Sequence, residues 1–140
     1  MSDLDALRAL GLSVRREVLG DRYVDAALTK ADDFSGPFQD FLNEVCWGKA
    51  WGDPALTQGQ RSLLNLGMLA ALGRMQEFET HFRGALRNGL TRDELRATLI
   101  QIAVYCGVPA GVECFRAAAR VLAEFDPAEP PLRPTAEEKA

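Results

Sequence analysis

The chain has 140 residues, of which 47% are hydrophobic, and a formal net charge of -4 at pH 7. This length suits one compact domain, and the apolar content excludes a chain that is disordered throughout. An acidic chain without a run of Lys or Arg argues against nucleic-acid binding, which needs a concentrated basic face.

Helical patterns run through the first third of the chain, and no alternating β-branched run indicates a strand. Residues 3–19 predict one or two short helices that break near Gly11 and stop at Gly20, and residues 22–31 predict another. Ser35 is a candidate N-cap for the next helix, whose apolar spacing predicts one buried face. That face consists of Phe38, Phe41, Leu42 and Val45.

The segment after this helix contains both tryptophans of the chain. Two glycines and Pro54 predict that it is a loop. Indole rings in a loop can wall a pocket, and they can equally pack over the core or at a subunit interface. Trp47 and Trp51 are therefore candidate substrate-binding residues.

Capping boxes open two helices in the second half of the chain. Thr57 with Gln60 begins a helix that is apolar on nearly all sides and is expected to be central. Thr91 with Glu94 begins another, with a predicted buried stripe of Leu95, Leu99, Ile102, Ala103 and Cys106. A last helix is predicted over about 110–125. Its inward-facing residues are expected to be Val112, Phe115, Ala119 and Leu122.

These patterns predict a single all-α domain of six or seven helices over residues 1–125. The helices carry more apolar surface than a 15.3 kDa monomer hides, which predicts a homo-oligomer. Residues 126–140 are rich in Pro and charge and predict a flexible tail.

The chain is expected to be cytoplasmic and without a membrane partner. Its acidic N-terminus is unlike a secretory signal, and no apolar run reaches the roughly 18 residues of a membrane span. Three widely spaced cysteines form neither CxxC nor a zinc pattern, so no metal site is expected. We interpret Cys46, Cys106 and Cys114 as reduced, partly buried cysteines and assign no role to them.

The only histidine lies in the helix predicted over residues 74–88, at the edge of its core face. That core face consists of Met75, Phe78, Phe82, Ala85 and Leu86, and the polar strip beside it of Arg74, Glu77, His81 and Asn88. Glu77 is one turn from His81 and is expected to raise its pKa, as suits a proton donor near pH 7. By itself the strip is more typical of a solvated helix boundary with ordinary i,i+4 polar pairs.

Two further residues are candidates for substrate contact. Arg61, early in its helix, can bind a carboxylate bidentately, or can be an exposed first-turn arginine. Tyr105 can contact an oxyanion, or can be a core residue with a satisfied hydroxyl.

The order of these features resembles the carboxymuconolactone decarboxylase family. The resemblance covers about residues 8–125 and includes a "WG…W…P.L…R" segment, an "E…H…AL.NG.T..EL" segment and an "AVY.G.PA" segment. The matching stretches are residues 14–28, 38–74, 77–95 and 101–111.

The resemblance implies the alkylhydroperoxidase-like fold and a ring-shaped homo-oligomer, a hexamer or trimer. It implies a carboxy-lyase that converts 4-carboxymuconolactone to 3-oxoadipate enol-lactone in protocatechuate degradation. Redox relatives carry CxxC followed four residues later by His, whereas Arg74 and Glu77 stand here in the two cysteine positions.

When CO₂ leaves, the unsaturated lactone of this substrate accepts the remaining electron pair. No cofactor is therefore expected. We hypothesise that Arg61 binds a carboxylate and that His81, supported by Glu77, donates the proton or stabilises the oxyanion. Trp47 and Trp51 would exclude water. The second candidates for the oxyanion contact are Arg74 and Tyr105.

Three alternatives remain. The chain can be a family member that acts on another lactone, aromatic or polyketide-type substrate. It can be a redox protein of the peroxidase type, or a helical oligomer that binds without catalysis.

Overall fold

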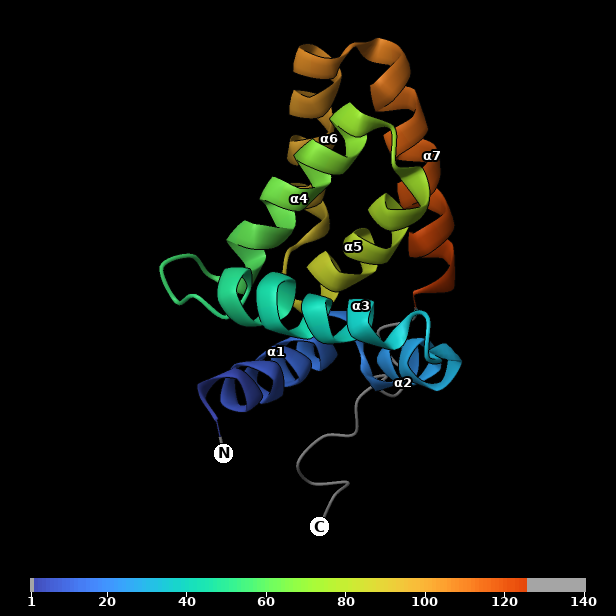
Figure 1. Cartoon of the computed structure of the whole chain (residues 1–140). Helices are drawn as coiled ribbons and strands as arrows, with labels where there is room; N and C mark the ends of the chain where they lie inside the picture. Colours follow the sequence, from blue (N-terminus) through green and yellow to red (C-terminus); the bar gives the residue numbers. More distant parts are fainter. Residues whose placement is uncertain (1, 126–140) are drawn as a thin grey trace. The chain divides into compact units, whose positions relative to one another are not determined.

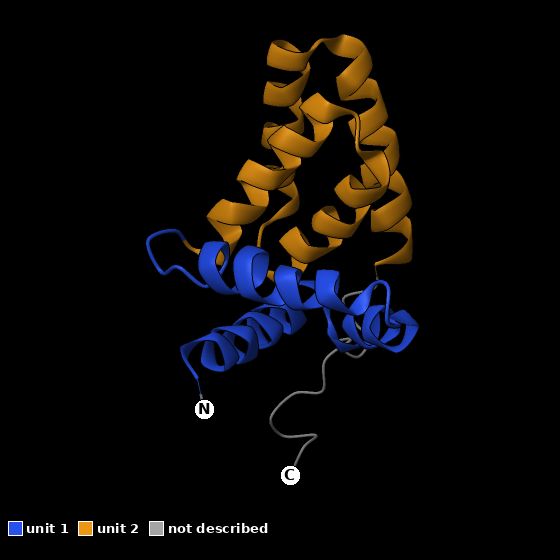
Figure 2. Ribbon diagram, viewed as in Figure 1, with its two compact units in different colours: residues 1–56, 130–140 blue, residues 57–129 orange. Residues whose placement is uncertain are grey.

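The computed structural model describes residues 2–125, which are helical with no strand among them, as the sequence predicts (Figure 1). These residues form two compact units, 2–56 and 57–125 (Figure 2). The first unit contains α1 (Asp3–Leu19), α2 (Asp21–Lys30), α3 (Gly36–Phe41) and the π-helical η1 (Leu42–Ala50). The second contains α4 (Gln58–Leu72), α5 (Met75–Arg87), α6 (Arg92–Cys106) and α7 (Val108–Glu124).

In the first unit, α1 runs unbroken through Gly11, so the predicted break is wrong. The glycine serves close packing instead. A Cβ at Gly11 would stand 1.7 Å from the backbone oxygen of Asn43 in η1. Gly20 does end the helix as predicted, with a φ of 88° that favours glycine.

The loop predicted around the tryptophans is also wrong in part. The helix that begins as α3 continues as η1 to Ala50, and the amide of Trp51 still donates to the carbonyl of Cys46, 3.0 Å away. Gly48 stays helical, and a Cβ there would approach the backbone oxygen of Leu7 in α1 to 2.9 Å. The small residue allows contact with α1 and does not break the helix.

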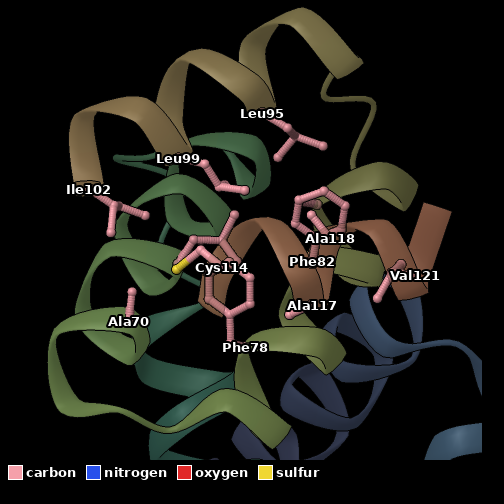
Figure 3. Close-up of a cluster of buried hydrophobic side chains, with 12 residues drawn as sticks. Ala70, Phe78, Phe82, Leu95, Leu99, Ile102, Cys114, Ala117, Ala118 and Val121 are labelled. Atoms are coloured by element: carbon pink, nitrogen blue, oxygen red, sulfur yellow. The ribbon is translucent and has the colours of Figure 1, made fainter. Parts of the chain in front are cut away.

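In the second unit, both predicted capping boxes are present, with Thr57 accepting from the amide of Gln60 and Thr91 from that of Glu94. Gly73 ends α4 in the left-handed conformation, as expected. α5 contributes stacked Phe78 and Phe82 to the core, which residues of α4, α6 and α7 complete (Figure 3). Ten of the core side chains are labelled there: Ala70, Phe78, Phe82, Leu95, Leu99, Ile102, Cys114, Ala117, Ala118 and Val121.

Several helix faces predicted to be buried are exposed. The helix expected to be central, α4, buries Leu66 and Ala70 but exposes its opposite side. Several large apolar residues that the sequence pattern places on buried faces are exposed in the structure. They are Phe38, Phe41, Val45, Leu64, Met68, Leu72, Val112 and Phe115. Ala119 and Cys106 are exposed as well, whereas Leu122 packs on the core. Periodicity identifies an apolar face, but it does not identify what covers that face.

No helix within residues 2–125 is long and apolar enough to cross a membrane. The single domain predicted over residues 1–125 stays a prediction. The predicted tail, residues 126–140, lies outside the described residues.

Candidate active site

His81 lies on the side of α5 that meets α4. The predicted core face of α5 is confirmed, because Phe78, Phe82 and Ala85 are buried and Met75 and Leu86 pack on the same core. His81 is partly buried at the edge of this face, and its Nδ1 lies 3.4 Å from the side-chain nitrogen of Asn65 in α4.

The other polar edge of α5 is tied to α7. Arg83 pairs with Glu124, and Arg120 pairs with Glu79 through its Nη2 at 2.6 Å. The side chains of these ion pairs are at least partly exposed, so each pair contributes little to the stability of the fold. The ion pairs show that α7 packs against the face of α5 that carries Glu79 and Arg83, whereas the edge that carries His81 contacts α4.

The electrostatic expectation for His81 is wrong in its net direction. Burial lowers the pKa of His81 below its ordinary 6.5, and the negative charge of Glu77 opposes that shift without reversing it. The imidazole is therefore neutral at pH 7 in the unliganded protein. The reason is that Glu77 is exposed, where water screens its charge, whereas the imidazole loses much of its hydration.

A second contact between the same helices lies near the end of α5. The side-chain amide of Asn88 donates to the hydroxyl of Ser62 at 2.8 Å and to the backbone oxygen of Gln58 at 3.3 Å. Ser62 is fully buried, so its hydroxyl depends on such partners. Two of the four strip residues, His81 and Asn88, thus contact α4, and the strip is not a solvated boundary along its whole length.

Asn65 is absent from the residues that the sequence pattern singles out. It is the one polar side chain in the apolar run from Leu63 to Leu72, and an amide in such a run is the signal that points to it. Arg61 lies one turn before Asn65 on α4, so both project from the same side of the helix. Arg61 is partly buried, unlike an ordinary exposed first-turn arginine.

The two second candidates for the oxyanion contact lie in exposed positions. Arg74 is exposed at the N-cap of α5. Tyr105 is 83% exposed near the end of α6, so its alternative placement in the core is wrong. A contact of either residue with a substrate stays a prediction.

Trp47 and Trp51 belong to the core of the first unit. Their rings stack with centroids 5.0 Å apart, and they are only 4% and 7% exposed. They pack in one cluster with Val14, Val18 and Val24. Core packing is thus observed for both rings, and their role against a substrate stays a prediction.

The three cysteines are free, with Cys46 partly buried, Cys106 exposed and Cys114 buried. Burial raises the pKa of Cys46, and it raises that of Cys114 to about 11. Both thiols are therefore protonated at neutral pH and poor nucleophiles. Within residues 2–125, His, Cys, Asp and Glu side chains nowhere gather in a group of three that could hold a metal ion.

Comparison with known proteins identifies the family of the chain. The model of the carboxymuconolactone decarboxylase family matches residues 36–120. A 4-carboxymuconolactone decarboxylase of Acinetobacter baylyi is 41% identical over 100 residues, 71% of this chain and 75% of that protein. A nitrosuccinic acid decarboxylase of Metarhizium robertsii is 43% identical over 103 residues, 74% of this chain and 72% of that protein. The chain belongs to the carboxymuconolactone decarboxylase family.

Proposed function

We propose that the chain is a carboxy-lyase that converts 4-carboxymuconolactone to 3-oxoadipate enol-lactone without a cofactor. The observation that carries the proposal is the contact between a partly buried, neutral His81 and the side chain of Asn65 in α4. Asn65 itself lies one turn from Arg61 on the same helix. The relative from Acinetobacter baylyi supports the choice of substrate.

The reaction needs little from the protein because the substrate contains its own electron sink. The bond between the γ-carbon and its carboxylate breaks, CO₂ leaves, and the electron pair moves through the ring double bond to the carbonyl oxygen of the lactone. The resulting dienolate takes a proton at the α-carbon. The protein has to bind the dianion, stabilise the developing oxyanion and deliver one proton.

Each of these tasks has a candidate residue. Arg61 binds a substrate carboxylate through its guanidinium. His81 stabilises the oxyanion or donates the proton. A bound dianion opposes the effect of burial just as Glu77 does, so substrate binding raises the pKa of His81 and favours proton uptake by the imidazole.

The relative named for nitrosuccinic acid favours a second candidate substrate. Both molecules are succinates. The carbon that loses CO₂ carries a CH₂–COO⁻ group and an electron acceptor, which is the unsaturated lactone in one and the nitro group in the other. Both substrates therefore require the same two tasks of the protein. It has to hold the remaining carboxylate and to protonate the carbanion equivalent.

Two of the three thiols argue against the peroxidase alternative, whereas Cys106 is exposed. A peroxidatic cysteine must be an accessible thiolate. Cys114 is buried with a pKa of about 11, and burial raises that of Cys46 as well.

The test is a direct assay without metal or cofactor. 4-Carboxymuconolactone is generated from its muconate precursor with a cycloisomerase, and CO₂ and enol-lactone are followed; nitrosuccinate is assayed in parallel. We expect turnover of the lactone. Turnover of nitrosuccinate alone would reassign the substrate, and turnover of neither by the folded protein would reject the proposal.

His81→Ala should lower turnover roughly 10²–10⁴-fold, the usual contribution of a general acid–base group. The matched control is Gln76→Ala on the exposed side of the same helix, which should leave turnover unchanged. Near-normal turnover in a folded His81→Ala protein would remove His81 from the mechanism.

A further inference from the structure

We infer that Asn65 is a positioning residue that holds His81 in the tautomer with its proton on Nε2. The catalytic consequence rests on the proposed function, but the tautomer itself does not. The inference starts from the placement of Asn65, a partly buried amide within the otherwise apolar run from Leu63 to Leu72. Leucine would favour the helix more than asparagine does, so the amide is costly for α4 unless it has a partner.

The partner is the imidazole of His81. The side-chain nitrogen of Asn65 lies 3.4 Å from Nδ1, a longer separation than the ~3.0 Å of an average hydrogen bond. Catalytic hydrogen bonds are often this long before the substrate binds. The contact joins α4 to α5 across 16 residues of sequence, so it depends on the packing of the two helices.

The chemistry of the two groups decides which ring nitrogen carries the proton. An amide NH₂ group only donates, so Nδ1 must accept and must be unprotonated. In a neutral imidazole the proton then resides on the other nitrogen, Nε2. Because burial keeps the ring neutral at pH 7, a single tautomer is the relevant state of the free protein.

This tautomer suits the task proposed for His81. Nε2–H is a donor that can bond to the developing lactone oxyanion, and after proton uptake the same nitrogen can deliver a proton. Asn65 contacts His81 and not the substrate in this scheme. It would act by fixing which nitrogen donates, as orienting partners of catalytic histidines do.

The single histidine makes the test direct. In the full-length protein labelled with ¹⁵N-histidine, long-range ¹H–¹⁵N correlation spectra above the pKa of His81 contain the two nitrogens of one imidazole. We expect a protonated Nε2 and an unprotonated Nδ1 in the wild type. A wild-type ring with its proton on Nδ1 would overturn the inference, because Asn65 would then present its oxygen.

Asn65→Asp replaces the donor by an acceptor of similar size. We expect the proton to move to Nδ1 and the pKa of His81 to rise, because the carboxylate accepts from Nδ1–H and stabilises the imidazolium. Asn88→Asp makes the same chemical change at the other asparagine that bonds to α4, and it should leave the tautomer of His81 unchanged. An unchanged spectrum in folded Asn65→Asp protein would contradict the inference.

Turnover separates this inference from the proposed function. With the proton on the wrong nitrogen, Asn65→Asp should lose roughly 10²–10⁴-fold in kcat, as catalytic histidines in the wrong tautomer do. A tautomer that follows residue 65 while turnover stays unchanged would remove His81 from catalysis and leave the assignment of Asn65 standing.

Discussion

At the scale of single residues, the protonation of His81 is decided by a competition between burial and one exposed carboxylate. Burial wins, so the imidazole is neutral at pH 7 until an anion enters the site. Under the proposed function, His81 takes up a proton together with its substrate. Affinity for a dianion should therefore depend on pH in the range around the histidine pKa.

A titration of His81 by NMR should give a pKa below 6.5, and Glu77→Gln should lower it further by removing the charge that favours the imidazolium. Glu79→Gln, on the α7 side of the same helix, is the control and should have a smaller effect. A pKa above 6.5 in the wild type would show that burial does not dominate.

The lowered pKa of His81 also makes the free energy of unfolding depend on pH. The unfolded chain binds the proton more tightly than the folded one, so the contribution of the buried neutral ring is present above pH 6.5. It is lost as the pH falls through the lower pKa of the folded state. Free energies of unfolding measured in this range should fall less in His81→Ala than in the wild type.

At the scale of helices, the first unit depends on the close approach of α1 and η1. Gly11 and Gly48 leave room for backbone to meet backbone, at positions where turn propensity predicts breaks. A nine-residue π-helix is unusual, because such segments normally span a single turn. Its packing against α1 and the stacked tryptophans hold it in place.

Gly11→Ala should destabilise the protein strongly, at the upper end of the ~1–3 kcal/mol typical of overpacked sites or beyond it. The added Cβ would stand 1.7 Å from the Asn43 backbone oxygen, so the two helices must separate. Gly67→Ala is the matched control in the interior of α4, where no atom lies within 4 Å of the new Cβ. The free energy of unfolding of that variant should rise by up to ~1 kcal/mol, because alanine favours a helix interior more than glycine does. Urea unfolding of both variants checks the contrast, which equal effects would contradict.

At the scale of the whole molecule, the second unit exposes large apolar side chains from three of its helices. They are Leu64, Met68, Leu72, Ile100, Val104, Val108, Val112 and Phe115. The last three also line an open hollow of about 500 Å³ between α6 and α7. We propose that a second copy of the chain covers this surface, because apolar patches of this kind mark interfaces.

Light scattering after size exclusion should therefore give a multiple of the 15.3 kDa chain mass. Val104→Glu should shift the protein toward smaller species, because Val104 is 73% exposed and a buried carboxylate in the interface would be unpaired. Gln101→Glu adds the same side chain at an exposed polar position of α6 and should leave the mass unchanged. A wild-type mass of one chain would contradict the proposal.

The local pattern of the sequence is enough to predict a helical chain, the capping boxes of α4 and α6 and the core face of α5, because capping boxes and the 3.6-residue period are local properties. It also determined that His81 lies at the edge of that face. It wrongly predicts a break at Gly11, a loop at the tryptophans and a side-chain cap by Ser35, which precedes α3 without such a bond. The tertiary structure decided what local patterns do not contain. Gly11 and Gly48 are contact points only because α1 and η1 approach each other, and Asn65 contacts His81 only because α4 lies against α5. The pKa of His81 falls below 6.5 for the same reason, since desolvation depends on neighbours that are distant in sequence.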